Sequence, residues 1–289
     1  MKNIAKSILL VSGIVVTLLF TGTVLGYASN NEDGNGTHEN PIAVVSQQPG
    51  FCSIFRSWGF IGDSLCSGEH EYHKSDGSKG YADLYEYSWG QFICYATGAK
   101  GDNYSQGGET ARGWIERFWN NPKNRNNNID AKAEPKQAYI IALGVNDTYK
   151  KHPVGNVESD INKDDYTQNA QTYTGCYAGI IQRIQSIQPD AKIFVVTRPK
   201  EESTNEAYNE VVRRMSDIFE NVYVIDLYKY APSYNKEDYF RTKYFMGGHL
   251  NAAGYQYTAW MFMTYIDWII CHNLKDFEQV AFIGTDYKY

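Results

Sequence analysis

Cysteine is scarce in this sequence, and none of it occurs in a metal-binding pattern. Among 289 residues there are only five cysteines, scattered along the chain. Zinc sites usually show closely spaced Cys or Cys/His pairs, so the sequence predicts no metal. We expect most of the cysteines to be small buried apolar residues rather than disulfide partners, and no spacing singles out a pair. They are Cys52, Cys66, Cys94, Cys176 and Cys271.

A surplus of positive charge is also missing. The chain has 27 Lys and Arg against 33 Asp and Glu, a net charge of -6. No cluster of basic residues stands out that would neutralise phosphates, which argues against a nucleic-acid partner. A mildly acidic surface is ordinary, so the composition identifies no macromolecular partner and no oligomeric state.

Long apolar runs are absent except at the N-terminus. Lys2 and Lys6 precede an uncharged stretch, Ile8–Leu25, and small residues follow up to Ala28. This order predicts a secretory signal peptide over residues 1–28. An uncleaved anchor is the alternative, because the stretch is nearly long enough to span a bilayer. Four residues weaken it as a permanent span, so we expect a periplasmic or extracellular protein: Thr17, Thr21, Gly22 and Thr23.

The rest of the chain divides into a linker and one domain. Residues 29–50 are rich in Asn, Gly, Gln and Pro and show no periodicity, which predicts a flexible linker. Residues 51–289 are long enough for one domain with a substantial core. Tyrosine is frequent there, with 24 copies in the chain, and suits cores, interfaces and carbohydrate-facing clefts.

Within this domain, short apolar runs alternate with helical patterns. Strands are predicted at 58–61, 138–143, 192–197 and 221–226, with a weaker signal at 102–105. Apolar residues recur every three or four positions over 166–187 and 207–218, and a closing helix is expected over 251–271 with Asn251 as N-cap. This alternation predicts a doubly wound parallel sheet covered by helices on both faces. Ligands bind such sheets beyond the carboxyl ends of the strands.

Four short motifs point to that edge. Gly62-Asp63-Ser64-Leu65 follows the first strand, and Gly144-Val145-Asn146-Asp147 follows the second. Between them lies Asn103–Thr110, which contains Gly107-Gly108, and Gly247-Gly248-His249-Leu250-Asn251 stands near the C-terminus. Each motif alone is weak, since Gly-Asp-Ser is a common turn and a single histidine is more often structural. Their order and placement favour one shared cleft.

With these motifs the sequence resembles the SGNH/GDSL hydrolase family, from about Trp58 to the closing helix. The Ser, Gly, Asn and His of the family name correspond here to Ser64, Gly108, Asn146 and His249. The resemblance implies a three-layer α/β/α, flavodoxin-like fold. It is closest to a branch with an extended loop after the serine and a final block that begins Gly-Gly-His-Leu-Asn.

The resemblance implies a serine-esterase mechanism that needs no metal or organic cofactor. Ser64 is a poor nucleophile until a base removes its proton, and His249 can do so near neutral pH. The tetrahedral oxyanion would be held by the backbone N–H of Ser64, the backbone N–H of Gly108 and the side-chain amide of Asn146. A glycine at Gly108 leaves no Cβ in the way of the substrate.

One position departs from the family pattern. The acid that orients the histidine usually lies three residues before it, where this chain has Met246. A thioether is a poor acceptor for the imidazole N–H. Either a backbone carbonyl near Met246 or an acid from elsewhere must orient His249. Asp226, Glu237 and Asp238 are the candidates, none compelling.

Other polar residues near the motifs have plainer interpretations. We expect Asp63 and Asp147 to bond turn amides. The insert at 68–81 carries Glu69, His70, His73 and Asp76, but no helix that would align them on a metal, so a solvated loop forming one wall of the cleft is expected. Its tyrosines, with Trp89 and Trp114, could stack on sugars, although core packing is the default for both tryptophans.

The predicted function is hydrolysis of a small acyl ester, in the first place an acetyl ester, on a carbohydrate outside the cytoplasm. A lipase, lysophospholipase or thioesterase on the same scaffold is one alternative, and it requires a long apolar channel. A non-catalytic glycan-binding protein is the other, since the usual acid is absent. In each case the partner is a small molecule or a glycan.

Overall fold

The computed structural model describes residues 39–121 and 130–287. The predicted signal peptide, 1–28, and linker residues 29–38 lie outside this part of the chain. Among the residues that are described, no helix is both long and apolar enough to cross a membrane.

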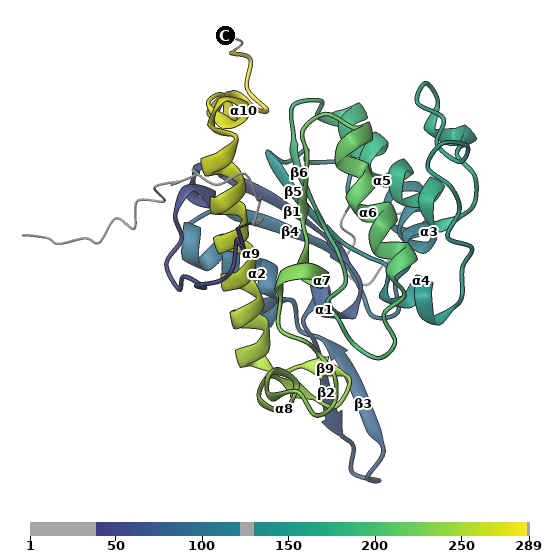
Figure 1. Ribbon diagram of the computed structural model, residues 1–289, viewed down its shortest axis with the longest axis vertical. Helices are drawn as coiled ribbons and strands as arrows, with labels where there is room; N and C mark the ends of the chain where they lie inside the picture. Colours follow the sequence, from purple (N-terminus) through teal and green to yellow (C-terminus); the bar gives the residue numbers. More distant parts are fainter. Residues whose placement is uncertain (1–38, 122–129, 288–289) are drawn as a thin grey trace, which may run out of the picture. The chain divides into compact units, whose positions relative to one another are not determined.

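The core of the domain is a parallel sheet of five strands in the order β4-β1-β5-β6-β7 (Figure 1). Numbered along the chain, this is the 2-1-3-4-5 order of flavodoxin-like folds, which confirms the predicted fold class. The weakly predicted strand is present as β4, at one edge. The strands are β1 (Ser57–Gly62), β4 (Lys100–Ser105), β5 (Ala138–Ala142), β6 (Lys192–Val196) and β7 (Val222–Ile225).

Helices cover both faces of this sheet. Helices α2 and α9 lie on one face, and α3, α5 and α6 on the other (Figure 1). Their bounds are α2 (Trp89–Thr97), α9 (Ala252–His272), α3 (Ala111–Trp114), α5 (Tyr173–Ile187) and α6 (Glu206–Ile218). The shorter α-helices are α1 (Ser64–Ser67), α4 (Val145–Tyr149), α7 (Leu227–Tyr230), α8 (Tyr239–Tyr244) and α10 (Leu274–Phe277). There are also the 3₁₀ helices η1 (Phe51–Ile54), η2 (Tyr85–Tyr87), η5 (Tyr166–Gln168) and η6 (Val280–Phe282), and a π-helix, η3 (Ile115–Asn120).

The sheet forms because its central strands are apolar on both faces. Successive side chains of a strand point to opposite faces. Ile140 and Phe194 therefore pack into the core beneath α2 and α9, whereas Ile141 and Val195 pack into the core beneath α5 and α6. Each fully buried side chain of this size contributes about 1.5–3 kcal/mol through removal of apolar surface from water.

Two of the three predicted helices begin and end close to the expected residues, and the third begins later. Asn251 caps α9, accepting from the N–H of Gly254 at 2.9 Å. The pattern over 166–187 predicted one helix, but α5 starts only at Tyr173, with Thr172 as its N-cap. Asn169 interrupts the pattern because its side-chain amide donates to the carbonyl of Gly175 at 2.9 Å, a bond a continuous helix would not allow.

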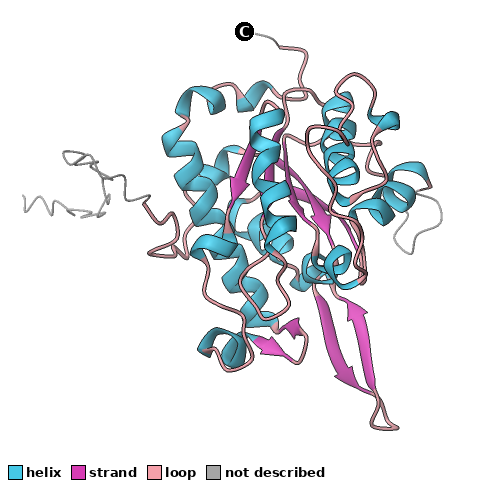
Figure 2. Ribbon diagram, turned by 45° about the vertical axis from the view of Figure 1, so that its right-hand side comes forward, coloured by secondary structure: helices cyan, strands magenta, loops and turns pink. Residues whose placement is uncertain are grey.

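The insert after the serine is a β-hairpin, not the expected loop. Strands β2 (Glu69–His73) and β3 (Lys79–Asp83) pair antiparallel and extend away from the sheet (Figure 2). The loop prediction was wrong because the strands show no apolar alternation that would mark them. A second, two-residue hairpin, β8 (Phe245–Met246) and β9 (His249–Leu250), contacts β2.

The compact unit begins at Asn40, within the predicted linker. Ile42 is 6% exposed and belongs to the core beneath α9. The N–H of Ser46 donates to the hydroxyl of Thr264 at 2.9 Å, and that of Cys52 to the carboxylate of Asp267 at 2.6 Å. Residues 40–50 are therefore anchored on α9 rather than free.

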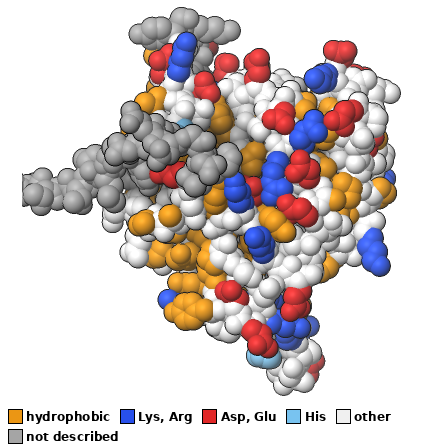
Figure 3. Space-filling view, in the orientation of Figure 1, with side chains coloured by type: hydrophobic (Ala, Val, Ile, Leu, Met, Phe, Trp, Pro, Cys, Tyr) orange, Lys and Arg blue, Asp and Glu red, His pale blue; other side chains and the backbone are white. Residues whose placement is uncertain are grey.

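All five cysteines are free, and four are buried as expected, Cys271 being exposed. On the face seen in Figure 3, basic and acidic side chains are interspersed. On α6 they form ion pairs, such as Arg213 with Glu206 and Arg214 with Asp217.

Candidate active site

Ser64 is the first residue of α1, directly beyond the carboxyl end of β1. Asp63 caps this helix, accepting from the N–H of Leu65 at 3.0 Å. The turn is tight: a Cβ on Gly62 would lie 2.3 Å from the Cβ of Cys66, so only glycine fits. Ser64 thus lies at the edge of the sheet where such folds bind their ligands.

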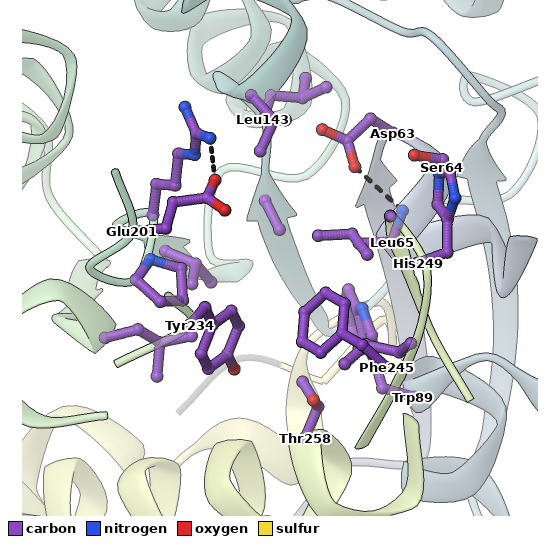
Figure 4. Close-up of a pocket in the computed structure, with 18 of the residues that line it drawn as sticks. Asp63, Ser64, Leu65, Trp89, Leu143, Glu201, Tyr234, Phe245, His249 and Thr258 are labelled. Carbon is purple, nitrogen blue, oxygen red and sulfur yellow. Dashed lines mark hydrogen bonds and ion pairs between the residues drawn. The ribbon is translucent and has the colours of Figure 1, made fainter. Parts of the chain in front are cut away.

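His249 reaches the same place from β9. Ser64, Asn146 and His249 all line one cavity of about 330 Å³. Figure 4 shows the side chains of Ser64 and His249 next to each other at one end of it. No hydrogen bond joins Ser64 Oγ to the imidazole within the described chain, because both ring nitrogens have other partners.

Those partners are two glutamates of β2. Glu71 Oε1 lies 3.1 Å from His249 Nδ1, and Glu69 Oε1 lies 2.9 Å from His249 Nε2. Residues two apart on a strand share a face, so β2 directs both carboxylates at the imidazole. Glu71 Oε1 also accepts from the N–H of Gly248 at 2.5 Å. The hairpin thus supplies an acid to Nδ1, the nitrogen that the usual triad acid would contact.

These contacts shift the pKa values of both partners. Burial alone would lower the pKa of His249, but hydrogen bonds and charge interactions with Glu69 and Glu71 outweigh it, so the pKa is raised above its ordinary 6.5. Burial likewise opposes ionisation of Glu71, yet bonds from His249, the Gly248 N–H and Lys79 hold its pKa below the ordinary 4.5. Glu71 is therefore an ionised acceptor at neutral pH.

None of the three acids that the sequence offered for orienting His249 contacts it, and two of them have other partners. Asp226 accepts from Arg213 Nε at 2.7 Å and from the Thr197 hydroxyl at 2.9 Å. Asp238 caps α8 through the N–H of Phe240 at 2.8 Å, and Glu237 is exposed. The structure brings none of the three to His249. Sequence reasoning missed Glu71, whose only signal was a second carboxylate two positions after Glu69 in the insert.

The three expected oxyanion donors are not equally placed. The amide nitrogen of Asn146 is buried and has no hydrogen-bond partner among the described residues, and its side chain lines the cavity. A buried donor without an acceptor is costly, which favours a ligand oxygen as its partner. Gly108 lies in the turn after β4 and does not line the cavity. The backbone there has a φ of +74°, a conformation that favours glycine. Space is not the reason for the glycine, because a Cβ at this position would meet no atom within 4 Å.

Asp63 and Asp147 bond turn amides, as expected. Asp147 accepts from the N–H of Ala111 at 3.1 Å and contacts His152 Nδ1 at 3.1 Å. Burial raises the pKa of Asp147, and it raises that of Asp63 to about 7. Trp114 is fully buried, its Nε1 donating to the carbonyl of Tyr104 at 2.9 Å.

Beyond Ser64 and His249 the cavity is largely apolar. Across the cavity lies Glu201 (Figure 4), and two further lining residues, Arg198 and Arg241, approach its carboxylate. In the described part of the chain, no group of three or more His, Cys, Asp or Glu residues could hold a metal ion. The apolar wall includes Trp89, Leu143, Val196, Leu227, Tyr234 and Phe262.

The GDSL-like lipase/acylhydrolase family matches residues 60–257. The chain belongs to this family. It is accordingly a hydrolase of the esterase and lipase type, and all four motif residues lie within the matched region. No curated protein matches the sequence.

Solved structures are similar to this family member over about three quarters of its chain. A protein from Lactobacillus plantarum has a TM-score of 0.51 at 16% identity, covering 74% of this chain and 97% of that one. A family two carbohydrate esterase from Clostridium thermocellum, in complex with cellohexaose, has 0.49 at 16%, covering 76% and 65%. A carbohydrate esterase family 2 enzyme from Corynascus thermopiles has 0.48 at 17%, covering 76% and 67%.

Proposed function

We propose that this hydrolase is a serine esterase in which Ser64 attacks the ester, His249 is the base and Glu71 orients His249. The observation that carries the proposal is the contact between Glu71 and Nδ1. An ionised acceptor at Nδ1 selects the tautomer whose Nε2 is free to take the serine proton. It also stabilises the imidazolium that forms when the proton is transferred.

The remaining steps follow from the same geometry. Attack on the carbonyl gives a tetrahedral oxyanion, to which the unpartnered Asn146 amide would donate. His249 returns the proton to the leaving alcohol, and the acyl-enzyme is then hydrolysed by water with His249 again as base.

Glu69 must leave Nε2 before this chemistry starts. Its Oε1 occupies the nitrogen that Ser64 needs, and its Oε2 would lie 2.1 Å from a Cβ on Gly107, beside the Gly108 turn. A bound ester would compete for this space, since the acyl carbonyl has to enter between the serine and the oxyanion donors. Glu69 therefore holds the free enzyme in a resting arrangement.

For the substrate we propose a small acyl ester, such as acetyl, on a carbohydrate outside the cytoplasm. The position of Tyr81 supports a carbohydrate as the substrate. Its ring is 51% exposed, and its centroid lies 5.6 Å from that of the His249 imidazole. An exposed aromatic ring beside the base offers a stacking surface for a sugar that carries the scissile ester. The predicted signal peptide supports export.

The cavity favours a second candidate, an esterase or lipase for bulkier acyl groups. A largely apolar volume of about 330 Å³ is several times that of an acetyl group. Ligand pockets of this size and lining bury apolar parts of their ligands. This candidate shares the mechanism and differs only in what occupies the cavity.

The test combines labelling with an ester series. A fluorophosphonate should label wild-type protein at Ser64, and Ser64→Ala and His249→Ala should abolish the labelling, whereas Ser53→Ala, at an exposed serine, should keep it. Activity on p-nitrophenyl esters from acetate to octanoate then separates the two substrates. Glycan binding without labelling or hydrolysis at any pH would overturn the esterase and favour a non-catalytic binding protein.

A further inference from the structure

A second group of charged side chains lies across the cavity from the catalytic residues. Figure 4 shows Glu201, with the arginine it pairs with, across the cavity from Ser64 and His249. That arginine is Arg198, which follows β6, and Arg241 of α8 approaches the same carboxylate at 3.7 Å. Two elements, the loop after β6 and helix α8, thus build this end.

Arg198 is held firmly and is nearly shut off from solvent. Its side chain is 8% exposed, and it donates to Glu201 and to the Ser203 hydroxyl, the latter at 2.6 Å. Its Nε is buried with no acceptor in the described residues. Burial lowers the pKa of Arg198, which means that the guanidinium pays a desolvation cost that its present partners do not fully offset.

Arg241 adds a second cation without a second anion. Its two terminal nitrogens donate to the carbonyls of Tyr234 and Gly247 at 3.2 and 3.1 Å, which position the charge but do not neutralise it. Glu201 is the one carboxylate in ion-pair distance that both arginines share. Two guanidiniums facing one carboxylate leave an excess of one positive charge.

The other titratable groups near this end do not remove that excess. Asp63 interacts with Arg198, but burial raises its pKa to about 7, so it is only partly ionised at neutral pH. Tyr149 places its ring 5.2 Å from the Arg198 guanidinium carbon and so contributes a cation–π contact rather than a carboxylate. Glu69 and Glu71 contact His249 but are not among the residues that line the cavity. The excess of positive charge in the cavity therefore lies at Arg198 and Arg241.

We propose that Arg198 and Arg241 form a subsite for a carboxylate or similar oxyanion of the substrate, joined to the scissile ester by an apolar spacer that fills the cavity. The planar guanidinium offers paired donors that match a carboxylate, and a charge-assisted hydrogen bond to a side chain as buried as that of Arg198 is strong. This inference rests on the proposed esterase and names its substrate class. The anion belongs either to the acyl chain or to the alcohol.

Matched ester pairs test it on the wild-type enzyme. For the acyl side, p-nitrophenyl hemiglutarate is compared with p-nitrophenyl butyrate, and for the alcohol side 4-acetoxybenzoate is compared with methyl 4-acetoxybenzoate. In one pair, kcat/KM for the anionic ester should exceed that for the neutral ester by about tenfold or more, as a charged hydrogen bond gives. Preference for the neutral ester in both pairs would overturn the subsite.

Variants test whether the preference for the anionic ester depends on Arg198 and Arg241. R198Q and R241Q should each lower the anionic-to-neutral ratio by about tenfold, and R198K should restore part of it, since lysine keeps the charge but not the fork. R214Q, at an exposed arginine paired with Glu158 and Asp217, is the matched control and should keep the ratio. Ratios that are unchanged in R198Q and R241Q would mean that both arginines only tie α8 to the loop after β6.

A binding measurement separates this inference from the esterase. Calorimetry on Ser64→Ala with p-nitrophenyl hemiglutarate, 4-acetoxybenzoate and their neutral counterparts needs no turnover. Tighter binding of either anionic compound, lost in Ser64→Ala/R198Q, supports the subsite even if no ester is hydrolysed. Equal affinities within both pairs overturn it, even if Ser64 proves to be a working nucleophile.

Discussion

At the scale of single residues, the chemistry depends on which group faces each nitrogen of His249. Glu71 holds Nδ1 and Glu69 holds Nε2. In the proposed mechanism, the first contact orients the imidazole and the second competes with Ser64. The two glutamates occupy the same face of one strand, yet their removal should have opposite consequences.

Glu71→Gln should lower kcat by about 10²–10⁴, because a glutamine amide can donate to Nδ1 and stabilise the wrong tautomer. Steady-state kinetics on a p-nitrophenyl ester measures this. Met246→Asp alone should give little activation, since Nδ1 already has an ionised acceptor. A large activation by Met246→Asp would mean that Glu71 does not serve the wild-type enzyme.

Glu69→Gln should extend activity to lower pH. His249 is a base only when neutral, and its raised pKa puts the acid limb of kcat/KM above pH 6.5. Removing the charge of Glu69 lowers this pKa, so the neutral imidazole persists into more acidic solution. The pH profile measures the shift, and the alkaline plateau should not fall. An unmoved limb would show that Glu69 leaves Nε2 before the proton transfer that limits the rate.

At the scale of elements, strand β2 shows which site residues could be predicted from the sequence and which could not. That Ser64, Asn146 and His249 line one cavity could be predicted, because each belongs to a short motif tied to a strand end or a helix start. Glu71 could not, because its strand shows no apolar alternation and, in the described residues, pairs only with β3 and reaches His249 by packing against β9. The same limit applies to residues 40–50, whose packing on α9 depends on distant contacts rather than local pattern.

Shortening the β2–β3 hairpin should distinguish the role of its tip from that of the strands at its base. Lys74–Ser78 form a turn in which the N–H of Lys74 donates to the carbonyl of Ser78 at 2.8 Å. Replacing these residues with Asn-Gly keeps the β2–β3 pairing, so kcat/KM should stay within about threefold of wild type. Deleting 69–83 removes Glu71 and should abolish hydrolysis. Equal activity of the two variants would exclude a role for β2 in orienting His249.

At the scale of the whole molecule, the cavity depends on a sheet packed on both faces. Phe194 lies fully buried on β6, in contact with the rings of Phe55 and Phe277. Among the described residues the sheet lies between the two core clusters. Because β1 leads into Ser64 and β6 into Arg198, the sheet fixes the spacing between these two residues of the cavity.

Phe194→Ala should therefore reduce the free energy of unfolding by about 3–5 kcal/mol, the usual cost of a large cavity in a core. Urea unfolding followed by circular dichroism measures it. Tyr95→Ala, at a ring 67% exposed on α2, is the control and should change stability by no more than about 0.5 kcal/mol. Similar losses in both variants would contradict the core assignment of Phe194.

Because the acid comes from a strand of a hairpin, its presence at the imidazole is a matter of register. A slip of one position along β2 would turn Glu71 to the opposite side and present His70 or Tyr72 in its place. No gradual adjustment lies between the two alignments. An enzyme built in this way loses its acid all at once or keeps it whole, unlike one whose acid sits three residues from the histidine on the same short loop.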